Sequence, residues 1–252
     1  MSVARDPRVV AVIPARYNSS RYQGKPLAMI AGAPMIEWVY RRVAMSERIS
    51  QVIVALDDER VEAVCRERGI PYIVTSDKHG TSTERVNEVA QKIDGDLFIV
   101  VNGDEPLIDY RVIEKIIPNE WPADAPYVAN LTSKIKSAPE VLDSTNIKVV
   151  WGPDMNAVFF SRSPIPYPKS SLSFDYYKHV GVLIYNRQAL AFFASTPRGP
   201  VEQVEDVNEL RFIERGIPLK MVVVESDETL SVDTPKDLHR VIAIVQARNI
   251  QL

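Results

Sequence analysis

The sequence predicts an α/β fold, in which a mostly parallel sheet is flanked by helices, because apolar runs alternate with amphipathic segments through its first half. The apolar runs are typical of buried parallel strands, and the segments between them carry apolar residues at helical spacing. This alternation favours helices on both faces of the sheet. Strands are expected at 8–13, 51–56, 72–74 and 96–101, and helices at 35–43, 59–68 and 83–92.

Local signals mark the ends of these elements. Pro34 suits the first turn of helix 35–43. The pair Asp57-Asp58 precedes helix 59–68 and can cap it, and Gly69 with Pro71 ends it. The boundaries therefore agree with the apolar periodicity.

Past about residue 120 the alternation gives way to strands with no long helix between them. They are expected at 127–132, 146–151, 157–161 and 179–185, which indicates an antiparallel excursion over about 120–185. Helices at 188–194 and 201–215, a strand at 219–224 and a helix at 235–248 follow. We expect residues 1–252 to form a single domain in which this excursion binds an acceptor or forms a dimer contact.

Composition and charge exclude several classes of partner. The chain of 252 residues has a formal net charge of −3, so its electrostatics give no reason to expect nucleic acid or an acidic membrane as principal partner. Cys65 is its one cysteine, so no internal disulfide can form. We see neither a signal peptide nor an apolar run that could span a bilayer. The expectation is a soluble cytoplasmic protein.

A basic loop follows the first strand. Arg16, Arg21 and Lys25 fall within ten residues, among small polar residues and Gly24. Such cations and closely approaching backbone N–H groups bind phosphate, and the carboxyl end of a strand in an open α/β sheet is a usual ligand site. The spacing is not that of a P-loop. The alternative is an ordinary solvated basic loop.

Two carboxylates are candidates for the same edge of the sheet. Asp104 follows strand 96–101 after Gly103, and Asp233 stands just before the helix at 235–248, where Thr234 and Pro235 suit a helix start. Carboxylate oxygens bind Mg²⁺, which commonly also binds phosphate oxygens. Turn formation and helix capping are the structural alternatives.

Further polar residues could contact a ligand. Hydroxyls at the helix start Thr81-Ser82-Thr83 can bind phosphate or a base edge, or simply cap the helix. Lys148, Arg162 and His179 in the middle segment could face an anionic acceptor, or be solvated or structural. On helix 201–215, solvated pairing is the default for Glu202, Glu205, Glu209 and Arg211.

Short motifs along the chain occur in a characteristic order and spacing. They are Ile13-Pro14-Ala15-Arg16-Tyr17, Ser20-Arg21, Gly24-Lys25-Pro26-Leu27, Thr83-Glu84-Arg85, Gly103-Asp104-Glu105-Pro106, Lys148-Val149-Val150, Phe160-Ser161-Arg162, His179-Val180-Gly181, Leu210-Arg211 and Val232-Asp233-Thr234-Pro235. Over almost the whole chain they resemble the 3-deoxy-manno-octulosonate cytidylyltransferase (CMP-Kdo synthetase) family. The resemblance implies a Rossmann-like nucleotidyltransferase sheet, a homodimer, and transfer of CMP from CTP to a small anionic sugar acid with release of pyrophosphate.

The resemblance also implies roles for the site residues. It implies that Arg16, Arg21 and Lys25 hold the CTP triphosphate, and that Asp104 and Asp233 hold Mg²⁺. Arg16, Lys25 and Asp104 form the expected catalytic set, because cations and Mg²⁺ stabilise the charge that develops on the phosphates. The cytidine would be seated by Ala15, Thr81, Ser82, Thr83 and Arg85. The acceptor would meet Asn102, Lys148, Arg162, His179, Glu202, Glu205 and Glu209.

The chain departs from the family pattern where the acceptor is expected. The family usually has Gln at Asn102, commonly Tyr at Leu183, Glu-Gln at Asn208-Glu209, and a glycine in the segment that here reads Thr81-Ser82-Thr83. Polar contacts to substrate hydroxyls set selectivity strongly, so these changes indicate an altered acceptor. A Kdo-like 2-keto-3-deoxy sugar acid is the first expectation; an amino-sugar variant, another 2-keto acid and a small phosphonate stay open.

Two other classes of protein compete with this interpretation. A metal-dependent glycosyltransferase would use similar carboxylates at strand ends, but it would more often present an Asp-x-Asp pair, and here Asp57 and Asp58 are adjacent. A non-catalytic nucleotide-binding protein would bind CTP without releasing pyrophosphate. Retention of the triphosphate- and metal-facing residues disfavours it.

Overall fold

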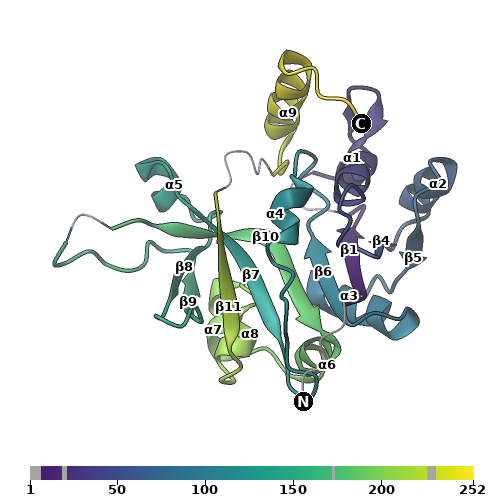
Figure 1. Cartoon of the computed structure of the whole chain (residues 1–252). Helices are drawn as coiled ribbons and strands as arrows, with labels where there is room; N and C mark the ends of the chain where they lie inside the picture. Colours follow the sequence, from purple (N-terminus) through teal and green to yellow (C-terminus); the bar gives the residue numbers. More distant parts are fainter. Residues whose placement is uncertain (1–6, 19–21, 172–173, 226–230) are drawn as a thin grey trace. The chain divides into compact units, whose positions relative to one another are not determined.

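The computed structural model of the chain describes residues 7–18, 22–171, 174–225 and 231–252 (Figure 1). Two compact units can be distinguished. The parallel-sheet unit comprises residues 5–114 and 227–252, and the mixed-sheet unit comprises residues 115–226 with 1–4. That the whole chain acts as a single domain stays a prediction.

Four strands form the sheet of the parallel-sheet unit. They are β1 (Val9–Ala15), β4 (Gln51–Leu56), β5 (Tyr72–Val74) and β6 (Leu97–Val101). β1 pairs with β4 on one side and β6 on the other, β5 pairs with β4, and every pair is parallel. The side chains of β6 and almost all of β1 and β4 are buried, which explains their continuous apolar runs. All four predicted strands are confirmed.

The helices of this unit are α1 (Met35–Val43), α2 (Glu59–Glu67), α3 (Ser82–Lys92), α4 (Tyr110–Glu114) and α9 (Pro235–Ala247). α1 packs on β1 and β4, and α3 packs on β1, β4 and β6. Side-chain caps begin α2 at Asp58, α3 at Thr81 and α9 at Thr234, as their sequences predict. The sequence analysis missed α4, the 3₁₀ turn η1 (Lys25–Leu27), and the hairpin of β2 (Met29–Ile30) and β3 (Ala33–Pro34), which are too short to show periodicity.

A small apolar cluster joins the last part of the chain to this unit. Val232 before α9 and Val241 of α9 are fully buried in it, together with Met35 and Trp38 of α1. The Trp38 indole N–H donates to the Ile30 carbonyl at 2.8 Å, so its polar atom is satisfied. Packing of Val232 holds the segment that carries Asp233.

The mixed-sheet unit is built around β7 (Val128–Lys134). β10 (Tyr177–Asn186) pairs with it antiparallel, and β11 (Leu219–Val224) pairs parallel (Figure 1). β8 (Lys148–Trp151) and β9 (Ala157–Ser161) form an antiparallel pair, and β8 also pairs with β10. Its helices are α5 (Ala138–Leu142), α6 (Arg187–Ser195), α7 (Pro200–Glu205) and α8 (Leu210–Ile213). The predicted antiparallel excursion is confirmed.

The predicted single helix at 201–215 is wrong, because the structure has two short helices there. Asp206 ends α7 with φ of 51°, a left-handed conformation that a continuing helix cannot contain. The Asp206 carboxylate accepts a hydrogen bond from Arg198 at 2.8 Å, and its carbonyl accepts one from Arg162 at 3.1 Å. These contacts stabilise the break between α7 and α8. None of the helices in the described ranges has the length and apolar character needed to cross a membrane.

Candidate active site

Lys25 lies between two carboxylates in the parallel-sheet unit. Its Nζ is 2.7 Å from Oδ2 of Asp104 and 3.4 Å from Oδ1 of Asp233. The three side chains are 15%, 20% and 30% exposed, so a ligand can reach them while their charges are screened less than on an open surface. We call these three residues the Lys25 centre.

Local backbone structure places Lys25. Gly24 has φ of 71°, a left-handed conformation that glycine adopts without steric cost, and its N–H donates to the Tyr17 carbonyl at 2.9 Å. Its Cα lies so close to the Tyr17 ring that an added Cβ would be 3.3 Å from the ring atoms. Lys25 then opens η1, with Pro26 inside it. The end of the basic loop is thereby fixed on Tyr17.

The two carboxylates are placed by contacts between segments distant in sequence. Gly103 lies against the end of β1, where an added Cβ would be 2.8 Å from the Pro14 carbonyl oxygen. The N–H of Val232 donates to the Asp104 carbonyl at 2.8 Å, which holds the segment before α9 beside the loop after β6. Asp104 and Asp233 therefore face the same lysine.

The donor set fits Mg²⁺ shared with a phosphate ligand. Oδ1 of Asp104 is buried and has no hydrogen-bond partner in the described part of the chain, so it is available to a cation. Asp233 supplies the second carboxylate. The described ranges contain no group of three His, Cys, Asp or Glu side chains that could hold a metal. Mg²⁺ is usually bound by one or two carboxylates together with phosphate oxygens and water, which matches this pair.

The other residues assigned to the triphosphate differ in their surroundings. Arg16 is exposed and directly follows the end of β1, and Ala15 is buried as the last residue of that strand. Arg21 lies outside the described residues. Their contacts with CTP stay predictions.

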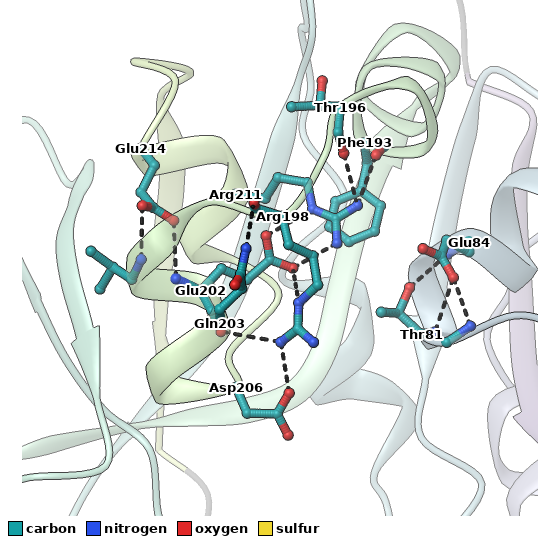
Figure 2. Close-up of polar contacts among 12 residues, drawn as sticks. Thr81, Glu84, Phe193, Thr196, Arg198, Glu202, Gln203, Asp206, Arg211 and Glu214 are labelled. Carbon is teal, nitrogen blue, oxygen red and sulfur yellow. Dashed lines mark hydrogen bonds and ion pairs between the residues drawn. The ribbon is translucent and has the colours of Figure 1, made fainter.

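Thr81 caps α3, as the structural alternative predicts. Its hydroxyl accepts from the Glu84 N–H at 3.1 Å, and the Glu84 carboxylate accepts from the Thr81 N–H at 3.1 Å (Figure 2). This reciprocal pair is a capping box. Ser82 is half-buried and Thr83 is buried. A nucleotide contact by any of the three stays untested.

Arg85 is fully buried, which the sequence analysis did not predict. Its guanidinium binds Oδ2 of Asp57 at 2.6 Å and the Thr75 hydroxyl. Asp57 directly follows β4, and Thr75 directly follows β5. The arrangement gives Arg85 a role in fixing strand ends, and it does not support direct contact with CTP. The sequence signal that could have indicated this pairing is Asp57, a carboxylate directly after strand 51–56.

The residues assigned to the acceptor are distributed over both units. Asn102 is half-buried after β6 in the parallel-sheet unit, and the others belong to the mixed-sheet unit. Lys148 is fully buried in β8, where its Nζ donates to the carbonyls of Asp143 at 2.9 Å and Asn146 at 2.7 Å. Burial lowers the pKa of Lys148, against the opposing attraction of nearby carboxylates such as Asp143.

Arg162 and Glu205 bind each other through several atoms. The Arg162 N–H and Nε donate to the Glu205 carboxylate and carbonyl at 2.9 Å and 2.7 Å. The remaining guanidinium donors reach the carbonyls of Ser144 and Asp206, both at 3.1 Å. The other Glu205 oxygen accepts from the Ser161 hydroxyl at 2.6 Å. In this arrangement Arg162 anchors the end of α7.

Glu202 and Arg211 form a buried ion pair, so the expected solvated helix face is wrong for these two residues. Nε and Nη2 of Arg211 donate to the two Glu202 oxygens at 2.9 Å and 2.6 Å (Figure 2). Nη1 donates to the carbonyls of Phe193 at 2.9 Å and Thr196 at 3.2 Å. Both side chains are 4% exposed or less. The pair ties α8 to α7 and α6, and acceptor binding by Glu202 stays untested.

His179 and Glu209 form a second pair of facing side chains in the mixed-sheet unit. His179 Nε2 is 3.6 Å from Oε1 of Glu209, within reach of an ion pair but too far for a hydrogen bond. Burial disfavours the charged carboxylate and is the largest single effect, but attraction to His179 and hydrogen bonding together outweigh it, so the pKa of Glu209 is lowered. His179 also lies edge-on to Phe160, with ring centroids 6.2 Å apart. The histidine side chain is 15% exposed, although its Nε2 is buried.

Comparison with known proteins agrees with this architecture. A family model described as cytidylyltransferase matches residues 10–227. A 3-deoxy-manno-octulosonate cytidylyltransferase of Geobacter metallireducens is 40% identical, over 93% of this chain and 96% of the relative. An 8-amino-3,8-dideoxy-manno-octulosonate cytidylyltransferase of a Shewanella species is 36% identical, over 92% of this chain and 96% of the relative.

A solved structure extends the comparison to three dimensions. The structure of a CMP:2-keto-3-deoxy-manno-octonic acid synthetase complexed with CTP matches with a TM-score of 0.88 and 38% identity, over 96% of this chain and all of that one. The sequence and structural matches both extend over nearly the full chain. This protein belongs to the cytidylyltransferase family, within its 3-deoxy-manno-octulosonate cytidylyltransferase branch.

Proposed function

We propose that this protein transfers the cytidylyl group of CTP to a Kdo-like 2-keto-3-deoxy sugar acid and releases pyrophosphate. The observation that carries the proposal is the Lys25 centre, in which one ammonium lies 2.7 Å and 3.4 Å from two partly buried carboxylates at the end of a parallel sheet. A triphosphate needs such a cation, and its Mg²⁺ needs such carboxylates. The solved CTP complex at 38% identity supports the choice of nucleotide.

In the proposed reaction, an acceptor hydroxyl oxygen attacks the α-phosphorus of CTP in line with the bond to the β-phosphate. That bond breaks, pyrophosphate leaves, and the hydroxyl proton is lost to solvent or to a nearby base. Lys25 and Arg16 stabilise the negative charge that grows on the phosphate oxygens. The protein otherwise contributes by holding the two reactants in line.

Mg²⁺ is part of the proposal, held by Asp104 and Asp233. When bound, it would neutralise phosphate charge and help the pyrophosphate to leave. The buried Oδ1 of Asp104, which has no hydrogen-bond partner among the residues that the structure describes, supports this assignment. Lys25, already 2.7 Å from Asp104, would keep the carboxylate oriented.

The acceptor is the least determined part of the proposal. Relatives named for the sugar acid itself and for its 8-amino variant are 40% and 36% identical to this chain, so identity alone does not separate the two. We expect the Kdo-like acid to be used, with the amino variant and a small phosphonate as the alternatives to test. We further propose a homodimer, on the basis of the family resemblance and the extended middle segment of the chain. We also propose that the protein works in the cytoplasm, which the absence of a second cysteine to pair with Cys65 supports.

Pyrophosphate release from CTP and Mg²⁺ tests the proposal, with Kdo, 8-amino-Kdo, neuraminate and several phosphonates as acceptors. We expect release with one sugar acid and its loss in Asp104→Asn. Asp94→Asn is the control, because the Asp94 side chain is 82% exposed in the same unit. Nucleotide binding without pyrophosphate release from any acceptor would contradict the proposed activity.

A further inference from the structure

The strand that carries His179 is interrupted directly after that residue. β10 and β7 pair in register up to His179, opposite Thr132, and resume with Leu183 opposite Asn130. Val180, Gly181 and Val182 of β10 therefore lie opposite only Leu131 of β7. Such bulges change where neighbouring side chains point, and they occur often beside active sites.

A bulge removes ladder partners from the backbone, and here a side chain replaces them. Asn130 is fully buried, and its amide nitrogen donates to the carbonyls of Val180 at 2.9 Å and Val182 at 3.0 Å. On the other side of His179, the Thr132 hydroxyl donates to the Lys178 carbonyl at 2.8 Å. Buried carbonyls without partners are costly, so these bonds stabilise the irregular backbone.

Other contacts show that the orientation of His179 is specified from several sides. The backbone N–H of His179 donates to the Ile147 carbonyl at 2.9 Å. The imidazole ring meets Phe160 edge-on, and its Nε2 faces Oε1 of Glu209 at 3.6 Å. Nε2 itself is buried without a hydrogen-bond partner in the described part of the chain. The ring position therefore depends on the backbone rather than on a strong side-chain hydrogen bond.

We infer that Asn130 is a positioning residue, which holds the bulge of β10 so that His179 is aimed at the acceptor. We call the two hydrogen bonds from Asn130 to the Val180 and Val182 carbonyls the clamp. The inference rests on the proposed function for the role of His179 in acceptor binding, but not for the clamp itself. Asn130 would touch neither substrate. Its loss should let the bulge rearrange and displace the imidazole.

Three variants separate this role from a general loss of stability. Asn130→Asp keeps the size of the side chain and removes both donated hydrogen bonds, and Asn130→Leu removes them without adding charge. Asn186→Asp is the matched control. Asn186 is also buried, and its amide nitrogen donates to the carbonyls of Pro122 at 3.1 Å and Ala125 at 2.8 Å, at the far end of β10.

Kinetics give the first measurement. Both Asn130 variants should lower kcat/KM for the acceptor by roughly tenfold to a hundredfold, the loss typical of a small displacement in a site, and leave the KM for CTP unchanged. In a His179→Ala background the same substitutions should have little further effect, because the residue that they position is gone. Additive losses, or an equal loss in Asn186→Asp, would overturn the inference.

Imidazole NMR gives the second measurement, which needs no turnover. The chain has three histidines, so their ring signals can be assigned by substitution. In folded Asn130→Asp and Asn130→Leu, the His179 signals should shift while those of His79 and His239 stay in place, and Asn186→Asp should leave all three unchanged. Unshifted His179 signals would refute the clamp. A wild-type protein that uses no acceptor would refute the proposed function, and the NMR result would still decide the role of Asn130.

Discussion

Replacing Gly103 with alanine would push a methyl group into the backbone of β1. The added Cβ would be 2.8 Å from the Pro14 carbonyl oxygen and 3.5 Å from Cγ2 of Ile13. Real Cβ atoms essentially never come closer than 3.0 Å to another heavy atom, so a backbone segment has to move. Pro14 lies inside the paired part of β1, opposite Ala55, and cannot yield independently.

The cost of this substitution follows from the size of the clash. Forcing one extra methyl into a packed site costs about 1–3 kcal/mol of unfolding free energy. For a chain of this size, 1 kcal/mol lowers Tm by about 2–4 °C, so we expect Tm to fall by about 2–12 °C. Because Asp104 follows directly, its carboxylate should move away from Lys25, and CTP affinity should fall in the protein that is still folded.

Calorimetry and CTP titration below Tm check both effects. Gly80→Ala is the control, because its added Cβ would meet only a flexible Glu84 oxygen at 3.5 Å, an ordinary contact distance. We expect that variant to keep its Tm. A Gly103→Ala protein with unchanged Tm and unchanged CTP affinity would show that the reasoning from this contact is wrong.

Lys25→Met should raise the KM for CTP by about tenfold or more, because a hydrogen bond to a charged group contributes about 1.5–3 kcal/mol. Mg²⁺ alone should raise the Tm of this variant more than that of the wild type, because Asp104 and Asp233 have lost the ammonium group that neutralised them. Glu88 has its pKa lowered to about 2, since hydrogen bonds such as that from Lys92 outweigh the effect of burial. The contribution of the charged Glu88 carboxylate to the free energy of unfolding is present above pH 4.5 and is lost as pH falls towards 2. In acid unfolding, Glu88→Gln should therefore lose less stability between pH 4.5 and pH 2 than the wild type. Arg211→Met leaves Glu202 buried without its main partner and should cost about 3–5 kcal/mol in urea unfolding. Adding Glu202→Leu should recover part of that loss, and a double variant as unstable as the single one would contradict this account.

Much of the fold could be predicted because its signals are local. Continuous apolar runs mark β1, β4 and β6, since strands buried on both faces have no polar positions. Caps are local as well, and Asp58 and Thr81 begin their helices as predicted. The carboxyl ends of parallel strands share one sheet edge, which is why Lys25 and Asp104 could be expected near each other.

The errors concern contacts between residues distant in sequence. The break between α7 and α8 depends on Asp206, whose left-handed backbone is held by Arg198 and by Arg162, which directly follows β9. The apolar periodicity of residues 201–215 gives no indication of these two partners. Arg85, which the family resemblance implies helps to seat the cytidine, is bound in the interior by Asp57 at the end of another strand, a contact that the sequence pattern does not show; its contact with CTP stays untested. The clamp by Asn130 depends on a bulge that apolar alternation cannot reveal.

CTP titration by calorimetry, with and without Mg²⁺, tests most directly whether the Lys25 centre binds the nucleotide. Comparing the wild type with Asp104→Asn isolates the carboxylate that lies 2.7 Å from Lys25. We predict that Mg²⁺ strengthens CTP binding to the wild type and that Asp104→Asn removes most of that gain, with a loss of about tenfold, or about 1.4 kcal/mol. Equal CTP affinity of the two proteins in Mg²⁺ would contradict the assignment of the triphosphate and its metal to this centre.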